Sequence, residues 1–337
     1  MPHIFFNGLF FAFMAFGLLK IVVELVGAGL YDLKQVRQHK QRDALPANMP
    51  LVSVIIPARN CQATIRDCLD SIVKNSHKNV EIIVVNRAST DETRQIIAGF
   101  IASHKHRTIR LLNKRQDTGR EAGIISGYNR WSKGGLIMTL DGDCLLDQQA
   151  IMKAAAHFEP GGISALTPNI RILARPTISG LAQRFTYLMR SRTMKLVAAT
   201  EGTAMMYRRD IFKKRKGSVK SRPRYASDVL VYAEPLPLGR ALLIPSQGNP
   251  WLSKSRPALY LLELVLLGYL LYVAIALRQP MLLGISWLLF SVLLAIAVAS
   301  DEQGRISRKI PLLLLTPMIS GVFGFLVCAR AITVLPA

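Results

Sequence analysis

The sequence predicts an α/β domain with a mostly parallel sheet, flanked by transmembrane α-helices. Short apolar runs alternate with helical patterns between residues 51 and 158, and long apolar segments lie on both sides of that region. Strands that alternate with helices at this spacing imply a parallel sheet with helices on both faces. The predicted parts are an N-terminal transmembrane helix (1–30), a basic linker (31–50), a cytosolic domain (51–250) and a transmembrane region of about three helices (251–337).

The predicted elements of the cytosolic domain follow one another closely. Ser89 and Glu92 fit a capping box that opens a helix, and Asp147 is a candidate N-cap for another. In chain order we expect strand 51–57, helix 63–74, strand 80–85, helix 89–104, strand 108–112, helix 119–131, strand 135–140, helix 147–158, an extended segment 164–172, helix 178–195, and strands 203–207 and 241–245.

The flanking segments predict a multi-pass membrane protein. Residues 4–29 are long enough to span a bilayer, as are 258–277, 280–299 and 310–335. Lys and Arg residues follow the first of these segments, which places the downstream domain in the cytosol. We therefore expect four spans, both termini outside, and a location in the bacterial inner membrane.

Charge and cysteine content narrow the functional class. The 337 residues are 50% hydrophobic and carry 43 Lys or Arg against 21 Asp or Glu, a formal charge of +22. This excess fits cytosolic loops and lipid headgroups, or an anionic substrate such as a nucleotide diphosphate. Nucleic acid is not an expected partner, because aromatic stacking motifs and zinc spacings are absent from the sequence. The four cysteines show no paired spacing and are expected to be reduced.

Two carboxylates follow the apolar run at 135–140, in the motif Asp141-Gly142-Asp143. In a strand, residues two apart point to the same side, so both could bind one cation. Such oxygen ligands suit Mg²⁺ or Mn²⁺. The alternative is a turn, because Asp-Gly is a strong hairpin signal. The predicted sheet favours the metal site, since ligands bind beyond the carboxyl ends of parallel strands. Other polar residues at such ends are Arg59, Asn60, Asn86 and Arg87.

These features together resemble the membrane-integrated family 2 glycosyltransferases, which have the GT-A fold, and in particular the poly-N-acetylglucosamine, hyaluronan and cellulose synthase group. The resemblance runs from Val52 to about Pro245. The best-matching stretches are Val54-Ile-Ile-Pro-Ala-Arg-Asn60, Glu81 to Asp91, Gly119-Arg-Glu-Ala-Gly123, Leu140-Asp-Gly-Asp-Cys-Leu-Leu146 and Gly202-Thr-Ala-Met-Met-Tyr-Arg-Arg209.

The resemblance implies a role for each matching position. Asp141 and Asp143 would hold the divalent ion that bridges the diphosphate, with Asp141 also able to contact the ribose. Gly202 would lie near the acceptor, and Asp228 would be the catalytic base. The residues implied to bind the nucleotide sugar or the acceptor are Pro57, Arg59, Asn60, Asn86, Arg87, Arg120, Asp141, Gly202, Gln247 and Trp251.

The chain also departs from the family pattern at these positions. Arg87 stands where the family commonly has an aspartate that contacts the nucleotide, and Arg120 replaces a common lysine. Ser227 replaces the glutamate before the implied base. Processive members carry Gln-x-x-Arg-Trp, whereas the closest stretch here is Gln247-Gly-Asn-Pro-Trp251.

The resulting hypothesis is an inverting transferase that moves a sugar, such as a hexose or N-acetylhexosamine, from a nucleotide-diphosphate sugar to a lipid-linked or polysaccharide acceptor. A UDP-sugar is the first choice of donor, Mg²⁺ or Mn²⁺ the cofactor, and the cytosolic membrane face the location. Further expected partners are membrane lipids and either a small membrane subunit or a second copy of the chain. The alternative hypothesis is a catalytically degenerate protein that binds a nucleotide or scaffolds a partner synthase.

Overall fold

A computed structural model describes residues 22–23, 26–33, 49–158, 163–173, 183, 187, 191, 195, 204–210 and 223–235. The chain divides into two compact units. One unit comprises residues 1–36, 174–197 and 235–337, and the other comprises residues 37–173 and 198–234. The second unit carries the sheet and all the candidate site residues that the structure describes.

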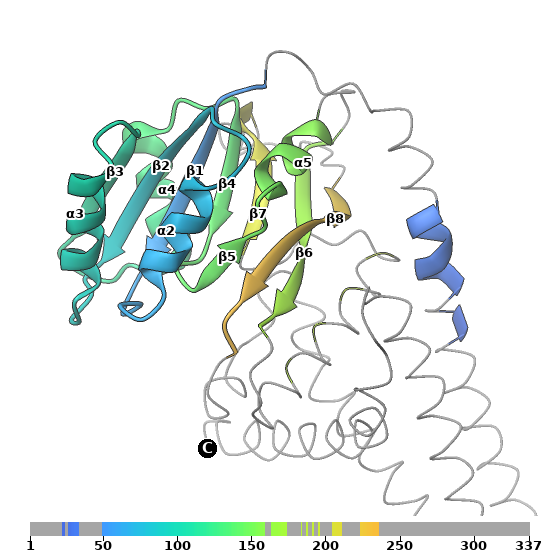
Figure 1. The fold of residues 1–337 in the computed structure, drawn as a ribbon, viewed down its shortest axis with the longest axis horizontal. Helices are drawn as coiled ribbons and strands as arrows, with labels where there is room; N and C mark the ends of the chain where they lie inside the picture. The colour runs from blue at the N-terminus through green and yellow to red at the C-terminus, as the bar shows by residue number, and fades with distance from the viewer. Residues whose placement is uncertain are drawn as a thin grey trace, which may run out of the picture. The chain divides into compact units, whose positions relative to one another are not determined.

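The first half of the sheet is parallel, as predicted. Strand β1 (Val52–Ala58) lies between β2 (Val80–Arg87) and β4 (Leu136–Leu140), and β3 (Ile109–Lys114) pairs with β2. Because all four strands run in the same direction, their carboxyl ends meet at one edge of the sheet and their amino ends at the other (Figure 1). We call these the carboxyl edge and the amino edge.

Three helices connect these parallel strands. They are α2 (Ile65–Val73), α3 (Thr93–Ser103) and α4 (Arg120–Trp131). In Figure 1, α2 lies in front of the sheet and α4 behind it. Helices on both faces explain why every residue of β1 is buried, and why its sequence is apolar at every position except Ser53 rather than alternating.

The second half of the sheet is mixed, so the prediction of a mostly parallel sheet holds only for β1 to β4. Its strands are β5 (Cys144–Leu146), β6 (Ala165–Ile172), β7 (Ala204–Arg208) and β8 (Pro223–Ala233), and the full order is β3-β2-β1-β4-β7-β6-β8-β5. Strand β7 is antiparallel to β4 and to β6, β8 is parallel to β6, and β5 is antiparallel to β8.

Helix α4 packs on the parallel strands through a close contact at Gly127. A Cβ there would lie 3.0 Å from methyl groups of Ile55 and Val85. These two residues belong to a buried cluster with Ile83, Ile124 and Ile137, so this face of the sheet is covered by the helix. The close approach fixes where each end of α4 lies, and those ends carry residues of two candidate sites.

The predicted helix starts were only partly right. Helix α3 begins at Thr93, and neither Ser89 nor Glu92 makes the capping-box contacts. Helix α5 (Ala150–Ala156) begins three residues after Asp147, because the Asp147 carboxylate accepts a hydrogen bond from the Gln149 amide and forms a turn before the helix. The short strand β5 and the long strand β8 were not predicted at all. Strand β5 depends on pairing with β8, and β8 pairs along most of its length with β6.

The described part of the chain includes no helix that is both long and apolar enough to cross a membrane. The three predicted C-terminal spans lie outside the described residues, as does most of the predicted N-terminal span. The predicted domain boundaries and membrane topology therefore stay predictions.

Candidate active site

The motif Asp141-Gly142-Asp143 forms a turn that joins β4 to β5 at the carboxyl edge. The Cys144 amide donates a hydrogen bond of 3.1 Å to the Asp141 carbonyl oxygen, which closes the turn. The alternation expected of a strand therefore does not apply, because β4 ends at Leu140. The alternative prediction of a turn is therefore confirmed, although the turn does not form a hairpin, since β5 pairs with β8 and not with β4. The turn still places both carboxylates within three residues, beyond the end of a buried strand.

Asp141 is held by a guanidinium at the start of α4. Arg120 Nε donates to Asp141 Oδ1 at 2.6 Å, and each side chain is 22% exposed. Burial raises the pKa of Asp141 to about 6, although the charge and hydrogen bond of Arg120 act in the opposite direction. The negative charge of Asp143 raises the pKa further. Asp141 is thus a carboxylate whose ionised form depends on nearby positive charge.

The turn is fixed in place by the segment between β1 and α2. The Thr64 hydroxyl donates to the Gly142 carbonyl oxygen at 3.0 Å. A Cβ at Gly142 would lie 2.9 Å from Cys61 Sγ, so the thiol and not a ligand takes the space that a side chain would need. Burial raises the pKa of the Cys61 thiol to about 11, which keeps it protonated at neutral pH. Cys61 is a free thiol, as expected from the sequence, and acts as a packing residue.

Arg59 and Arg87 both bind Asp117, a residue that the sequence did not single out. Arg87 donates to Asp117 Oδ1 from Nε at 2.9 Å and from Nη2 at 2.6 Å, and Arg59 pairs with Oδ2. Although burial by itself raises the pKa of Asp117, the Gly119 amide and Arg87 hold it below its usual value. Only the three-dimensional structure reveals this pairing, because Asp117 lies thirty residues from Arg87 in the sequence.

Asn60 and Asn86 shape the loops of the carboxyl edge. Asn60 adopts a left-handed backbone conformation with φ of 48°, which asparagine tolerates better than most residues, and its Oδ1 accepts from the Thr90 amide. Asn86 Oδ1 accepts from the Ser89 amide, and its Nδ2 donates to Asn113 Oδ1. Both side chains therefore hold neighbouring loops together. Pro57, at the same edge, lies next to Gly123 of α4.

Asp228 lies in an irregular part of β8. Pro168 of β6 pairs with Ala226 while Asn169 pairs with Leu230, so residues 227–229 bulge out of the ladder. The Asp228 carboxylate lies 2.9 and 3.1 Å from Nε2 of His157, which is 5% exposed.

Asp228 precedes the residues of β8 that pair with β5. Leu230 is three residues from Ala233, the partner of Cys144, which corresponds to about 10 Å along the strand, and Asp228 lies beyond Leu230.

Glu234 is an acidic residue at this site that sequence reasoning missed. It follows the last residue of β8, and its amide donates a hydrogen bond of 3.3 Å to the Asp143 carbonyl oxygen. The signal that could have found it is an acid directly after a strand, but β8 itself was not predicted. Gly202, Gln247 and Trp251 lie outside the described residues, so their predicted roles stay predictions.

The residues of the turn fit a divalent cation. Among the described residues, no group of three or more His, Cys, Asp and Glu side chains could hold a metal ion alone. Mg²⁺ needs no such group, because it usually binds one or two carboxylates and takes its other ligands from substrate phosphates and water. Asp141 and Asp143 supply two such carboxylates, and the ionised form of the half-buried Asp141 is stabilised when a cation is near.

Residues 53–216 match the family model described as "Glycosyl transferase family 2". A "Glycosyltransferase GlyA" of Streptococcus pneumoniae is 33% identical over 100 residues, which are 30% of this chain and 14% of that protein. A "Poly-beta-1,6-N-acetyl-D-glucosamine synthase" of Staphylococcus epidermidis is 27% identical over 138 residues, 40% of this chain and 32% of that protein. The chain thus aligns with less than half of either relative.

Among solved structures, the mannosyltransferase PcManGT from Pyrobaculum calidifontis, in complex with GDP-Man and Mn²⁺, is similar at 15% identity and a TM-score of 0.48. The alignment covers 90% of this chain and 97% of that one.

Proposed function

We propose that the chain acts through its glycosyl transferase family 2 domain, at residues 53–216, as an inverting glycosyltransferase. It would move a sugar from a nucleotide-diphosphate sugar to a lipid-linked or polysaccharide acceptor at the cytosolic membrane face. The observation that carries this proposal is the β4–β5 turn at the carboxyl edge, which carries Asp141 and Asp143 and in which Asp141 binds the guanidinium of Arg120. Ligands of parallel sheets bind at this edge.

The charged residues of this edge suit a diphosphate leaving group. Cleavage of the sugar–phosphate bond adds negative charge to the leaving diphosphate, and fixed cations lower the energy of that transition state. Arg120 starts α4 and is oriented by Asp141, so its guanidinium is already placed at the edge before substrate binds. Mg²⁺ or Mn²⁺ held by Asp141 and Asp143 would act as a Lewis acid on the same phosphates.

The acceptor hydroxyl needs a carboxylate that takes its proton, since a sugar hydroxyl is a poor nucleophile at neutral pH. The resemblance implies Asp228 for this role, whereas the main chain brings Glu234 to Asp143. Asp228 would have to leave His157 or act while hydrogen-bonded to it. We therefore propose Glu234 as a second candidate base beside Asp228.

The remaining features of the proposal rest on the sequence. A UDP-sugar is the proposed donor, and membrane lipids and a membrane-bound acceptor are the proposed partners. The apolar segments that flank the domain support a multi-pass membrane protein, and the basic residues after the first segment support a cytosolic catalytic domain.

A second candidate function is nucleotide binding without turnover. The observation that favours it is the Arg59–Asp117–Arg87 cluster, in which an arginine held by Asp117 stands where the resembled family commonly has an aspartate. Calorimetry with a panel of nucleotide diphosphates separates the two candidates. Metal-dependent binding with no sugar transfer or donor hydrolysis would favour the binding protein.

The test of the enzyme is Mn²⁺-dependent turnover of nucleotide sugars by the purified full chain. Asp143→Asn is expected to lower the rate at least about a hundredfold, because it removes one carboxylate of the proposed metal pair. Asp67→Asn is the matched control, since Asp67 is an exposed aspartate on α2 and should leave the rate unchanged. Equal turnover by Asp143→Asn and wild type would remove the turn from the mechanism.

The two candidate bases are separated by Asp228→Asn and Glu234→Gln. Loss of the base is expected to cost about a hundredfold or more in the rate constant of transfer while donor binding is kept. If only the Asp228 variant loses transfer, Glu234 is not the base, and the reverse result would exclude Asp228.

A further inference from the structure

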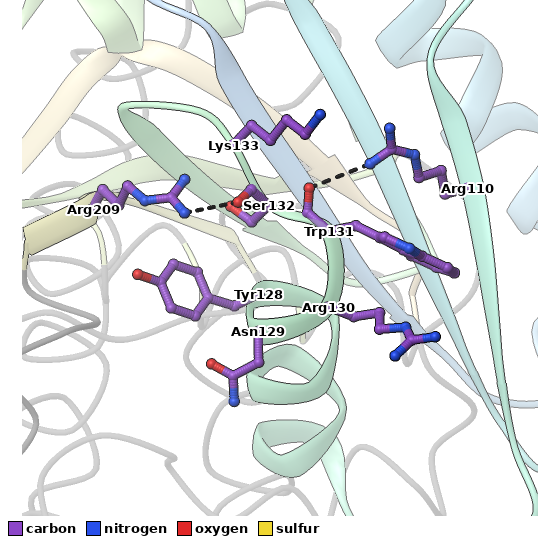
Figure 2. A pocket seen from close by; sticks show the side chains of 8 residues that line it. All are labelled: Arg110, Tyr128, Asn129, Arg130, Trp131, Ser132, Lys133 and Arg209. Atoms are coloured by element: carbon purple, nitrogen blue, oxygen red, sulfur yellow. Dashed lines mark hydrogen bonds between the residues drawn. The ribbon is translucent and has the colours of Figure 1, made fainter.

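A cavity lined by basic and aromatic side chains lies at the amino edge of the sheet, opposite the β4–β5 turn. It has a volume of about 650 Å³, within the usual range for sites of small molecules. Figure 2 shows the lining side chains around the end of α4 and the segment that follows it. The lining residues are Arg110, Tyr128, Asn129, Arg130, Trp131, Ser132, Lys133 and Arg209, and we call this cavity the amino-edge pocket.

The lining of the amino-edge pocket includes four cations and no acid. Arg209 donates from Nη1 to the Gly134 carbonyl oxygen at 3.1 Å and from Nη2 to that of Ser132 at 2.8 Å. Its guanidinium also lies over the Tyr128 ring, 5.4 Å from the centroid. Arg110 Nη1 donates to the Trp131 carbonyl oxygen at 3.4 Å.

These contacts have an ordinary structural purpose, because cations and donors at a helix C-terminus stabilise its last carbonyl groups. These contacts use only some of the N–H donors of Arg110 and Arg209, since a guanidinium has five of them. They also hold each guanidinium in one orientation, which lowers the entropy lost when an anion binds.

Arg130 and Lys133 are different, since their side chains are exposed. Among the residues that the structure describes, neither side chain forms a hydrogen bond or an ion pair. The amino-edge pocket therefore combines two anchored cations with two exposed ones.

The loop that carries Ser132 and Lys133 is rigid. Glu81 is 3% exposed, and its Oε1 accepts hydrogen bonds from Ser53 Oγ at 2.6 Å and from the Lys133 amide at 2.5 Å. The Gly134 amide donates to the same oxygen at 3.2 Å. The buried carboxylate thus fixes the backbone behind the pocket, and its charge faces the loop amides. The pocket is therefore preformed.

We propose that the amino-edge pocket binds the phosphate ester of a small anion, either a soluble phosphorylated molecule or the headgroup of an anionic lipid. Phosphate oxygens match the fork of an arginine, and Arg110 and Arg209 each contribute one such guanidinium to the lining of the cavity. The basic lining is confined to the end of α4, the loop after it, Arg110 and Arg209, which favours a compact anion over a nucleic acid strand that follows an extended basic groove. The site is separate from the proposed sugar-transfer site, because it lies at the opposite ends of the same strands.

The experiment measures binding by calorimetry with the full chain in neutral detergent. The probes are glycerol 3-phosphate, short-chain phosphatidylglycerol, zwitterionic short-chain phosphatidylcholine and a single-stranded oligonucleotide. The test variant is the double substitution Arg130→Gln and Lys133→Gln. The matched control is Arg94→Gln with Lys74→Gln, which removes one exposed arginine and one exposed lysine from α3 and the end of α2.

The proposal expects binding of an anionic phosphate probe that weakens at least about tenfold in the test variant and is unchanged in the control. Tighter binding of phosphatidylglycerol than of glycerol 3-phosphate identifies a lipid headgroup, and the opposite order identifies a soluble ligand. Binding of neither probe, equal binding by the test variant, or tighter binding of the oligonucleotide would overturn the proposal. Because both test side chains are exposed, both double variants should unfold at the wild-type temperature. Sugar transfer is measured separately, so its failure is distinguishable from failure of this site.

Discussion

The two edges of the parallel sheet use the same cation, arginine, in different ways. At the carboxyl edge, the guanidiniums of Arg120 and Arg87 bind carboxylates, Asp141 and Asp117. At the amino edge, the guanidiniums of Arg110 and Arg209 bind backbone carbonyl groups. At the carboxyl edge, the charge of each guanidinium is neutralised by its carboxylate until a ligand or a metal binds one of the two. Cations on carbonyls keep their full charge and supply a fixed positive field. The first arrangement suits chemistry on a diphosphate, and the second suits binding of an anion.

The largest expected effect tests whether the amino edge is as rigid as its contacts indicate. A Cβ at Gly134 would lie 2.6 Å from the Leu51 carbonyl oxygen and the Ser53 amide nitrogen, both of them backbone atoms. Gly134→Ala should therefore lower the free energy of unfolding by about 3 kcal/mol. Gly135→Ala is the control, because a Cβ there meets nothing within 4 Å. Denaturant unfolding in neutral detergent measures the free energy of unfolding of both variants. Similar free energies for the two would show that the loop moves to make room for the added Cβ.

The next effect tests the buried carboxylate of the carboxyl edge through pH. Burial raises the pKa of Asp141 from 3.8 to about 6, so its protonated form favours the folded state. The stability it contributes is fully present below pH 3.8 and is lost as pH rises through about 6, a change of at most about 3 kcal/mol.

Asp141→Asn should remove this loss. Unfolding free energies measured between pH 4 and 7 should therefore fall more steeply for wild type than for the variant. Parallel profiles for the two proteins would contradict the raised pKa. Asp67→Asn, on the surface of α2, should keep the wild-type profile.

The next prediction, with a smaller expected effect, compares the stability lost when each of the two arginines that pair with Asp117 is replaced. Arg87 is 15% exposed, whereas Arg59 is 50% exposed, and both pair with Asp117. Arg87→Gln should destabilise the protein by about 2 kcal/mol, because it leaves a largely buried aspartate without its main partner. Arg59→Gln should cost less than about 0.5 kcal/mol, since an exposed pair is screened by solvent. Equal losses in denaturant unfolding would mean that burial does not set the strength of this cluster.

The smallest expected effect has the opposite pH dependence and belongs to the amino edge. His77, between α2 and β2, is buried, and its Nε2 lies 3.1 Å from the Pro50 carbonyl oxygen. Burial lowers the pKa of His77 below its usual value of 6.5. Its contribution to stability is therefore present above pH 6.5 and is lost as pH falls through the folded pKa.

Replacement of His77 by a residue that does not titrate should remove the loss of stability that protonation of His77 causes. His77→Gln is expected to flatten the stability profile below pH 6.5, measured by the same unfolding experiment. A profile identical to that of wild type would show that His77 does not titrate in this range.

The sequence by itself determined the parallel half of the sheet and the position of the Asp141-Gly142-Asp143 motif. Local patterns were sufficient there, because β1, β2 and β4 are largely apolar and buried, and helical patterns separate the strands along the chain. The end of a parallel strand is also the place where such sheets bind ligands, so the motif could be assigned to an edge without knowledge of its contacts.

Only the tertiary structure decided the partners of the charged residues and the course of β5 and β8. Arg87 with Asp117, Arg120 with Asp141, and His157 with Asp228 join residues 30, 21 and 71 positions apart. Strand β5 has three residues, too few to show a period, and exists because β8 supplies its hydrogen-bond partners. Contacts of this kind depend on how segments that are distant in the sequence pack together. The residue pattern within one segment therefore does not predict them.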